Sequence, residues 1–319
     1  AAEWSPEIGS WTFFGKSSGH VNPFGEINPD LIINALSRVM DRPYAPRAAG
    51  YGQKALEMTK ALVPNRDLGF CAGCPHRATF WAIKTALKLD GRGGFVTGDI
   101  GCYSIGLGPA GFYQLKTMHA MGSGTGIAAG LGQLRKFGFD QPVLSVCGDS
   151  TFFHATIPAL INGVYNKSNF VLVVLDNSAT AMTGFQPHAG TGETATGSPA
   201  PKIDIEKLCQ ALGVRVETAD PFDLQGTTEK ILDLINDEGG VRVLVSRRKC
   251  ALVKAKEEKA AYRMRVNPEK CLGESCGCAR ICTRIFKCPG LIWNKEKGKS
   301  QIDEAICNGC GGCTDICPR

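Results

Sequence analysis

The sequence contains no long uninterrupted run of apolar residues, although 43% of its 319 residues are hydrophobic. A helix that crosses a membrane needs about 18 consecutive apolar residues or more, so we expect no membrane span. The first residues also lack the apolar core of a secretion signal. We therefore expect a reducing, cytoplasmic location, where disulfides are rare.

Acidic residues are too few to balance the basic ones, with 30 Asp and Glu against 36 Lys and Arg, which gives a formal net charge of +6. The basic residues are dispersed, apart from short groups at 247–249 and 254–259. A nucleic-acid-binding surface needs its basic residues clustered, so we read these side chains as solvated surface and expect no nucleic-acid partner.

Cysteine, in contrast, is abundant: nine of the 15 cysteines lie between Cys271 and Cys317. The last four follow the spacing C-x2-C-x2-C-x3-C-P and are Cys307, Cys310, Cys313 and Cys317. This spacing is typical of bacterial ferredoxins, in which the first three cysteines bind one [4Fe-4S] cluster and the fourth binds another. Zinc would favour two separated pairs and disulfides an oxidising compartment, so we predict iron–sulfur clusters and an anaerobic setting.

A second set of ligands precedes this run and comprises Cys271, Cys276, Cys278, Cys282 and Cys288. Because Cys288 is followed by a proline, we predict that it completes the cluster held by the first three cysteines of the later run. Cys317 would then join three of the remaining four. Cys271 and Cys282 are the firmer predictions, and the choice between Cys276 and Cys278 stays open.

The pattern along the chain predicts three parts: an N-terminal extension over 1–62, an α/β domain over 63–255 and a small α+β ferredoxin-like domain with two clusters over 262–319. A charged linker is expected over 254–265. The expected strands are 94–97, 142–147, 170–175 and 241–246. The expected helices are 29–40, 77–88, 124–137, 157–166, 204–212 and 224–237. Such alternation predicts a parallel sheet with helices on both faces and ligands at the carboxyl ends of the strands.

Two polar turns follow neighbouring expected strands of this sheet. Gly148-Asp149-Ser150 ends one strand, and Asp176-Asn177 ends the next. A carboxylate, an amide oxygen and a nearby backbone carbonyl form a hard donor set that suits Mg²⁺ and leaves positions for phosphate oxygens. Gly148 allows close approach of a diphosphate, and the helix after Ser150 would offer backbone N–H groups to it.

The Gly-Asp…Asn spacing resembles the thiamine diphosphate motif. Three further stretches resemble the α subunit of indolepyruvate:ferredoxin oxidoreductases, a family of thiamine-dependent 2-oxoacid:ferredoxin oxidoreductases: Cys71-Ala-Gly-Cys74-Pro-His-Arg, Gly98-Asp99-Ile100-Gly101-Cys102-Tyr103 and Asp176 to Gly184. The resemblance runs from about Phe70 to Cys317. It implies that Asp149, Asn177 and the carbonyl of Ala179 bind Mg²⁺. The implied cofactor-binding residues are Gly98, Asp99, Ile100, Gly101, Gly148, Asp149, Ser150, Asn177, Ala179, Thr180, Met182 and Thr183.

The resemblance also implies a third cluster near thiamine, held by Cys71, Cys74, Cys102 and Cys250. On spacing alone, the pair Cys71-x2-Cys74 could equally be a redox pair, half of a zinc site or two core thiols. We expect the remaining cysteines, Cys147 and Cys209, to be buried apolar thiols.

Histidine is scarce, with five residues in the chain. His76 and His154 lie within the motifs and are the predicted catalytic candidates for proton transfer. His188 is a weaker candidate, and we expect His20 and His119 to be structural.

By its resemblance the chain is expected to act in oxidative decarboxylation of a 2-oxoacid with coenzyme A, giving acyl-CoA, CO₂ and reduced ferredoxin. An aryl pyruvate such as indolepyruvate is the expected substrate, with phenylglyoxylate as an alternative. The family's pyrimidine-binding and further domains are missing here, so we expect the chain to be either a fragment or one subunit of a hetero-oligomer whose partner subunits carry those domains. The rival hypotheses are a non-oxidative thiamine decarboxylase, which would not need the cluster ligands, and an electron-transfer subunit with a degenerate thiamine site.

Overall fold

A computed structural model describes residues 12–44, 47–48, 50–63, 68–237, 239–258, 260 and 262–318. The chain divides into two compact units, residues 1–67 and 68–319, and each is described by itself. Among the described residues, no helix has the length and apolar character needed to cross a bilayer.

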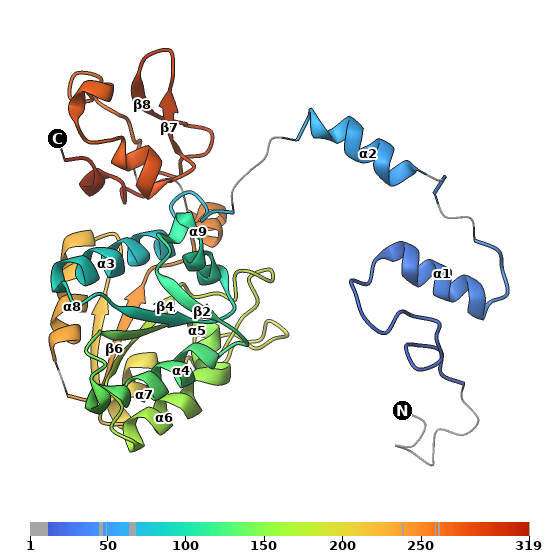
Figure 1. The fold of residues 1–319 in the computed structure, drawn as a ribbon, viewed down its shortest axis with the longest axis horizontal. Coiled ribbons are helices and arrows are strands. Elements are labelled where there is room, and N and C mark those ends of the chain that lie inside the picture. Colours follow the sequence, from blue (N-terminus) through green and yellow to red (C-terminus); the bar gives the residue numbers. More distant parts are fainter. Residues whose placement is uncertain are drawn as a thin grey trace. The chain divides into compact units, whose positions relative to one another are not determined.

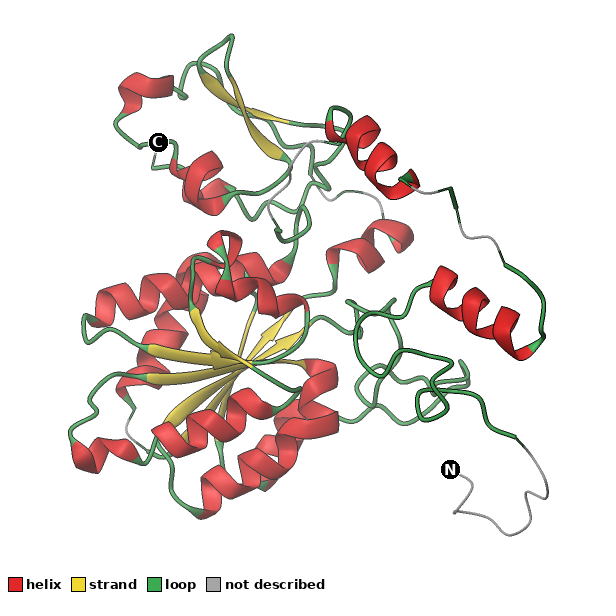
Figure 2. Ribbon diagram, turned by 45° about the vertical axis from the view of Figure 1, so that its right-hand side comes forward, coloured by secondary structure: helices red, strands yellow, loops and turns green. Residues whose placement is uncertain are grey.

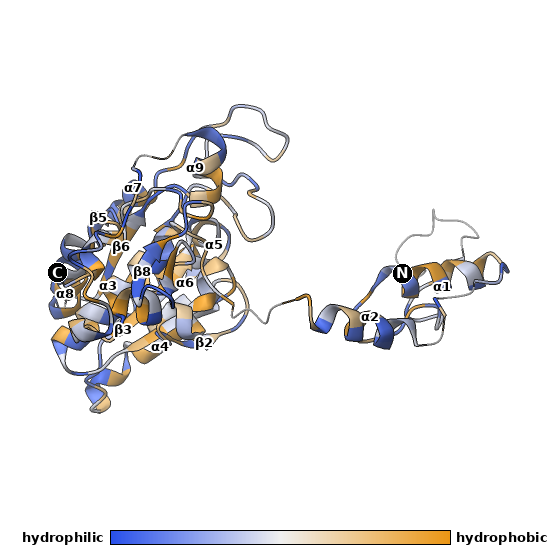
Figure 3. Cartoon of the chain, turned by 90° about the horizontal axis from the view of Figure 1, so that it is seen from above, coloured by the Kyte–Doolittle hydropathy of each residue, from blue (hydrophilic) through white to orange (hydrophobic). Residues whose placement is uncertain are grey.

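The N-terminal unit contains two helices, α1 (Pro29–Val39) and α2 (Tyr51–Lys60). Asn28 caps α1 by accepting a hydrogen bond from the backbone N–H of Leu31, and the proline that follows suits a first helical position. This confirms the helix predicted over 29–40, whereas α2 was not predicted. Ile33 and Leu36 of α1 are exposed, and Figure 3 shows hydrophobic segments, in orange, on this helix.

The second unit is built on a parallel sheet with strand order β2-β1-β3-β4-β6-β5. The strands are β1 (Phe95–Gly98), β2 (Leu115–Met118), β3 (Val143–Gly148), β4 (Phe170–Asp176), β5 (Arg215–Ala219) and β6 (Val241–Arg247). The four predicted strands are confirmed as the four central ones. The unpredicted strands β2 and β5 lie at the two edges, where partial exposure replaces the continuous apolar run of a buried parallel strand with a mixed pattern.

Helices cover both faces of this sheet, as Figures 1 and 2 show. The helices α3 (Pro75–Asp90) and α8 (Leu224–Asn236) pack on one face, and α4 (Ser123–Leu131), α6 (Ile157–Tyr165) and α7 (Ile205–Ala211) pack on the other. Alternate residues of β4 feed the two cores: Val171 and Val173 face α3 and α8, whereas Leu172 and Val174 face the other helices. The predicted α/β architecture is therefore confirmed.

One predicted helix is shorter than expected. Instead of continuing over 124–137, α4 ends at Leu131 and a separate helical turn covers Leu134–Phe137. At Gly132 a Cβ atom would lie 2.7 Å from the backbone oxygen of Asn169. The chain therefore passes the loop before β4 too closely for a side chain, and the helix ends at this contact.

The cysteine-rich C-terminal segment follows α9 (Ala251–Glu257), which occupies the first part of the predicted linker. It contains an antiparallel pair of strands, β7 (Leu291–Asn294) and β8 (Lys299–Ile302), and short helical turns at 273–276, 281–286 and 314–316. Phe286 and Ile316 are buried in the same core as α3 and α8. The segment is thus anchored on that side of the sheet unit.

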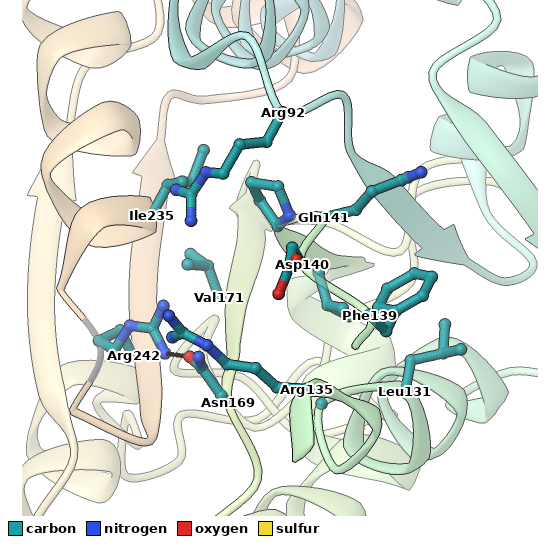
Figure 4. Close-up of a pocket in the computed structure, with 13 residues that line it drawn as sticks. Arg92, Leu131, Arg135, Phe139, Asp140, Gln141, Asn169, Val171, Ile235 and Arg242 are labelled. Carbon is teal, nitrogen blue, oxygen red and sulfur yellow. Dashed lines mark hydrogen bonds between the residues drawn. The ribbon is translucent and has the colours of Figure 1, made fainter. Parts of the chain in front are cut away.

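The amino ends of β4 and β6 enclose a small pocket of about 30 Å³, lined among others by Arg92, Arg135 and Arg242 (Figure 4). Arg242 is 3% exposed. Its Nε donates to the carbonyl of Leu234 at 2.9 Å, and its Nη1 donates to the Asn169 side chain and to the carbonyl of Gly240. These bonds tie β6 to the end of α8 and to the loop before β4.

Candidate cofactor site

The carboxyl ends of β1, β3 and β4 surround a second cavity, of about 180 Å³. The chain leaves β1 for β2 on one side and then returns to β3 on the other, so the strand order reverses between β1 and β3. Ligands of open parallel sheets bind at such a point. The predicted residues that line this cavity are His76, Ile100, Gly101, Cys102, Gly148, Asp149, Ser150, Asn177, Ala179, Thr180, Met182 and Thr183.

Asp149 lies directly after β3 with 2% of its surface exposed. Its Oδ1 accepts a hydrogen bond from the backbone N–H of Ser150 at 2.8 Å. Its Oδ2 is buried without a hydrogen-bond partner and lies 3.1 Å from Nε2 of the buried His188, within ion-pair distance but not aligned as a hydrogen bond. Such an atom is expected to gain from a positively charged ligand.

His188 is held in one orientation by its own loop. The backbone N–H of Gly190 donates to Nδ1 of His188 at 3.1 Å, so a neutral ring carries its proton on Nε2, the atom that faces Asp149. The ring of Phe153 packs on the imidazole with the ring centroids 5.7 Å apart. His188 can therefore donate toward the Asp149 carboxylate without itself acting as a metal ligand.

Asn177 follows β4 and is also paired with a histidine. Its Oδ1 accepts from the backbone N–H of Ala179 at 3.1 Å, and its Nδ2 lies 3.3 Å from Nε2 of His76. Burial at the start of α3 lowers the pKa of His76 to about 4, so the ring is neutral near pH 7 and Nε2 can accept the amide proton. This contact turns the amide nitrogen toward His76 and leaves the oxygen for Ala179 and a ligand.

Asp99, a predicted cofactor-binding residue, uses its oxygens inside the protein. Tyr103 donates its hydroxyl proton to one carboxyl oxygen, and the backbone N–H of Gly122 donates to the other at 3.0 Å. Burial raises the pKa of this carboxyl group. Asp99 and Gly98 are not among the described residues that line the cavity. Gly98 ends β1, and Asp99 follows it directly before the lining residue Ile100. α4 passes so close to Gly98 that a Cβ atom at Gly124 would lie 2.9 Å from the Gly98 Cα.

Sequence reasoning missed four residues of the cavity wall: Tyr103, Met121, Thr151 and Ala181. Tyr103 was quoted in a motif, but its contact with Asp99 depends on the turn that follows β1. The predicted catalytic residue His154 lies in the helical stretch Phe152–Thr156, where its side chain is exposed, and it is not among the residues described at the cavity. The structure therefore places His76, but not His154, beside the predicted metal ligands.

The donors at this cavity fit a magnesium diphosphate. Among the described residues, no group of three or more His, Cys, Asp or Glu side chains is arranged to hold a metal ion. The predicted magnesium site does not need such a group, because it takes one carboxylate, one amide oxygen and one backbone carbonyl, and phosphate oxygens supply the rest. The unpaired Oδ2 of Asp149 is the feature that such an ion would satisfy.

The four cysteines predicted near thiamine come from three separate loops that the fold brings together. Cys74 precedes α3, Cys102 follows β1 and Cys250 precedes α9. The pKa of the Cys74 thiol is raised to about 12, mainly by burial and in smaller part by the neighbouring Cys71 and Cys102. The pKa of Cys102 is raised by burial and by the nearby Cys250 and Cys71. Each of these two thiols therefore has other members of the predicted set among the groups that act on its pKa.

Two further cysteine groups occupy the C-terminal segment. The pKa values of Cys310 and Cys313 are raised by burial and by their neighbours Cys288 and Cys307, and these are the four cysteines predicted to share one cluster. The other group lines a cavity of about 240 Å³ and consists of Cys271, Cys276, Cys278, Cys282 and Cys317. Since both Cys276 and Cys278 line that cavity, the choice between them stays open. The prediction that Cys147 and Cys209 are buried is confirmed.

Comparison with known proteins agrees with this arrangement. Residues 99–245 match the family described as thiamine pyrophosphate enzyme, C-terminal TPP binding domain. Indolepyruvate oxidoreductase subunit IorA of Pyrococcus horikoshii is 41% identical over 272 residues, which cover 81% of this chain and 40% of the relative. The corresponding subunit of Methanothermobacter thermautotrophicus is 36% identical over 308 residues, 95% of this chain and 46% of the relative.

The chain belongs to the family of these indolepyruvate oxidoreductase subunits. It spans less than half the length of these two IorA relatives. A 2-oxoglutarate:ferredoxin oxidoreductase from Magnetococcus marinus superimposes with a TM-score of 0.50 and 19% identity, over 59% of this chain and 66% of that chain. This likeness supports the thiamine-binding α/β fold for the IorA-related chain.

Proposed function

We propose that this chain is the part of a thiamine diphosphate-dependent 2-oxoacid:ferredoxin oxidoreductase that binds the diphosphate end of the cofactor. Asp149, Asn177 and the carbonyl of Ala179 hold Mg²⁺, which binds the diphosphate. The observation that carries this proposal is Oδ2 of Asp149 at the reversal point of the sheet, which is buried without a hydrogen-bond partner and lies 3.1 Å from Nε2 of His188. Leaving a carboxylate oxygen buried without a partner costs free energy, and a bound cation would remove that cost.

Thiamine diphosphate, when bound, supplies the electron sink that allows a 2-oxoacid to lose CO₂. The residues of this chain bind and orient it. Gly148 leaves room for close approach, since it has no side chain where the backbone enters the cavity. Thr180, Met182 and Thr183 form the opposite wall. The neutral His76 holds the Asn177 amide and leaves its oxygen available for Mg²⁺. Partner subunits would carry the domains that bind the aminopyrimidine.

The three cysteine groups are proposed to bind three [4Fe-4S] clusters that carry single electrons away from thiamine. The thiolates of such a cluster bind the four iron corners of a cube from outside and lie farther apart than the ligands of a single ion, so a compact mononuclear site is not expected. The cavity of about 240 Å³ beside Cys271 and Cys317 and the grouping of the other thiols support this assignment. Residues 262–319 would then form a ferredoxin-like domain after the thiamine-binding domain of 63–255.

The substrate is proposed to be an aryl 2-oxoacid such as indolepyruvate, with coenzyme A and ferredoxin as the other reactants. The names of the curated relatives support this choice. The apolar side chains of Ile100, Met121 and Met182 line the cavity and are 39%, 45% and 52% exposed, so they could cover an aromatic side chain brought in with the substrate.

The test is to purify the chain anaerobically with its co-purifying partners and to measure thiamine diphosphate, magnesium, iron and sulfide per chain. We expect one thiamine and about twelve irons. The variant Asp149→Ala should lose thiamine and magnesium but keep iron, whereas Asp220→Ala, which alters a surface ion pair with Arg248, should keep all of them. Iron without thiamine in the unmodified complex would instead favour an electron-transfer subunit.

A further inference from the structure

Arg77 is a buried arginine in the first turn of α3, with 2% of its surface exposed. Its Nη1 donates to the carbonyl of Phe286 at 2.8 Å, and its Nη2 donates to the carbonyl of Phe70 at 2.6 Å. The rings of Phe70 and Phe286 lie 5.6 and 5.8 Å from the guanidinium carbon. The guanidinium group is therefore fixed between two aromatic rings. One ring belongs to a residue near the start of the second unit, and the other to a residue in its C-terminal segment.

The charge of Arg77 has no carboxylate partner. None of the ion pairs formed by the described residues includes Arg77, and its Nε is buried without an acceptor. Backbone carbonyls and aromatic faces supply partial charges only. A buried cation without a counter-charge is strongly unfavourable, so a negative group is expected beside it.

Cysteines from two different predicted clusters lie around this cation. Arg77 lines one cavity together with Cys74, Cys288 and Cys310. Burial lowers the pKa of the Arg77 guanidinium, and this is opposed by four neighbouring thiols: Cys288, Cys74, Cys71 and Cys310. A protonated thiol carries no charge, so cysteines without iron would not balance the guanidinium. Iron–thiolate clusters at these cysteines would supply the missing negative charge.

The two cysteine turns are also packed directly on each other. Nδ2 of Asn308 donates to the carbonyl of Ala72 at 3.0 Å. Gly73, at φ +68°, faces the same side chain, and a Cβ there would lie 2.2 Å from Nδ2 of Asn308. The turn before α3 and the turn after Cys307 are thereby held at a fixed separation, with Arg77 beside both.

We propose that Arg77 is the shared counter-charge of two iron–sulfur clusters, the one beside Cys71 and Cys74 and the one beside Cys288 and Cys310. This inference rests on the proposed function, which places clusters at these cysteines. A fixed positive charge stabilises the reduced, more negative form of each cluster. Arg77 therefore raises the reduction potentials of both clusters.

The experiment is an anaerobic potentiometric titration of the complete oxidoreductase, followed by electron paramagnetic resonance, with iron counted in every sample. Arg77→Met, which keeps an unbranched apolar stem but removes the charge, should lower both potentials. Arg77→Lys keeps the charge but loses the paired bonds to Phe70 and Phe286, and should leave both potentials near those of the unmodified protein. Arg242→Met removes a buried arginine at the amino end of the sheet and should shift neither.

A shift in only one cluster, or none, in an Arg77→Met protein with full iron content would overturn the inference. Equal shifts in Arg77→Lys and Arg77→Met would also overturn it, because a packing defect and not a charge would then be responsible. If Arg77→Met loses iron, the Arg77→Lys protein decides: potentials near the unmodified values support a role of charge, and lowered potentials contradict it. Absence of iron from the unmodified protein would instead refute the proposed function.

Discussion

The two ends of the parallel sheet treat buried polar groups differently. At the amino end, Arg242 is buried, but acceptors from Leu234, Asn169 and Gly240 surround it. At the carboxyl end, Oδ2 of Asp149 and Nε2 of His188 are buried side by side without a hydrogen bond. Buried polar groups are ordinarily hydrogen-bonded. The amino end follows this rule and stabilises the fold. The polar groups at the carboxyl end remain available to bind a ligand.

The largest expected effect comes from substituting one buried charged residue at each end of the sheet, Asp149 at the carboxyl end and Arg242 at the amino end. Asp149→Asn removes the charge that a cation would need, and we expect the affinity for thiamine diphosphate with Mg²⁺ to fall by more than about 100-fold. Its melting temperature without cofactor should not fall, since an amide replaces an unpaired carboxylate. Arg242→Met should behave in the opposite way, losing about 2 kcal/mol of stability and leaving cofactor affinity unchanged.

Isothermal titration with thiamine diphosphate, at fixed Mg²⁺, and thermal melts of the same anaerobic samples measure both quantities. The contrast between the two ends breaks down if Asp149→Asn destabilises the protein as much as Arg242→Met does, or if Arg242→Met weakens the cofactor to the same degree.

The neutral state of His76 predicts a pH dependence of stability. Its pKa of about 4 in the folded protein lies below the value of about 6.5 expected for an unfolded chain. The unfolded state therefore binds more protons between these values, and the contribution is complete above about pH 6.5 and is lost as the pH falls toward 4. The full loss amounts to about 3 kcal/mol.

His76→Gln cannot titrate and should flatten this part of the profile, measured as melting temperature between pH 7.5 and 5. His119→Gln, which alters an exposed histidine, should retain the slope of the unmodified protein. Identical slopes for all three proteins would show that His76 is not held neutral by the fold.

A smaller effect is expected at His188, which acts through Asp149. His188→Ala should weaken Mg²⁺ binding by about 10- to 100-fold, because the carboxylate loses the N–H group that faces it. His188→Asn, which can still present an N–H group, should recover part of the loss. Cofactor binding measured over a range of Mg²⁺ concentrations separates this from a general defect: the loss should disappear at saturating metal, and a loss that persists there would contradict the role.

The sequence could predict those features that depend on local pattern. The central strands are continuous apolar runs, and the proposed ligands Asp149 and Asn177 follow two of them, so their meeting at one edge follows from parallel topology. The contact of His188 with Asp149 could not be predicted, because it depends on the path of the loop after β4. The edge strands β2 and β5 were missed for a related reason: their half-exposed patterns are decided by neighbours and not by their own residues.

The smallest expected effect tests whether the carboxyl end is held together by close packing beside its cysteines. Gly73 and Gly197 both have positive φ, at +68° and +83°, but a Cβ would meet Asn308 at Gly73 and open space at Gly197. Both Gly→Ala variants carry the backbone strain, of about 1 kcal/mol. Only Gly73→Ala must also displace a side chain, so it should cost about 1 kcal/mol more. Adding Asn308→Ala should remove that excess, and an excess that remains in the double variant would show that the strain, and not the packing of the two cysteine turns, sets the cost.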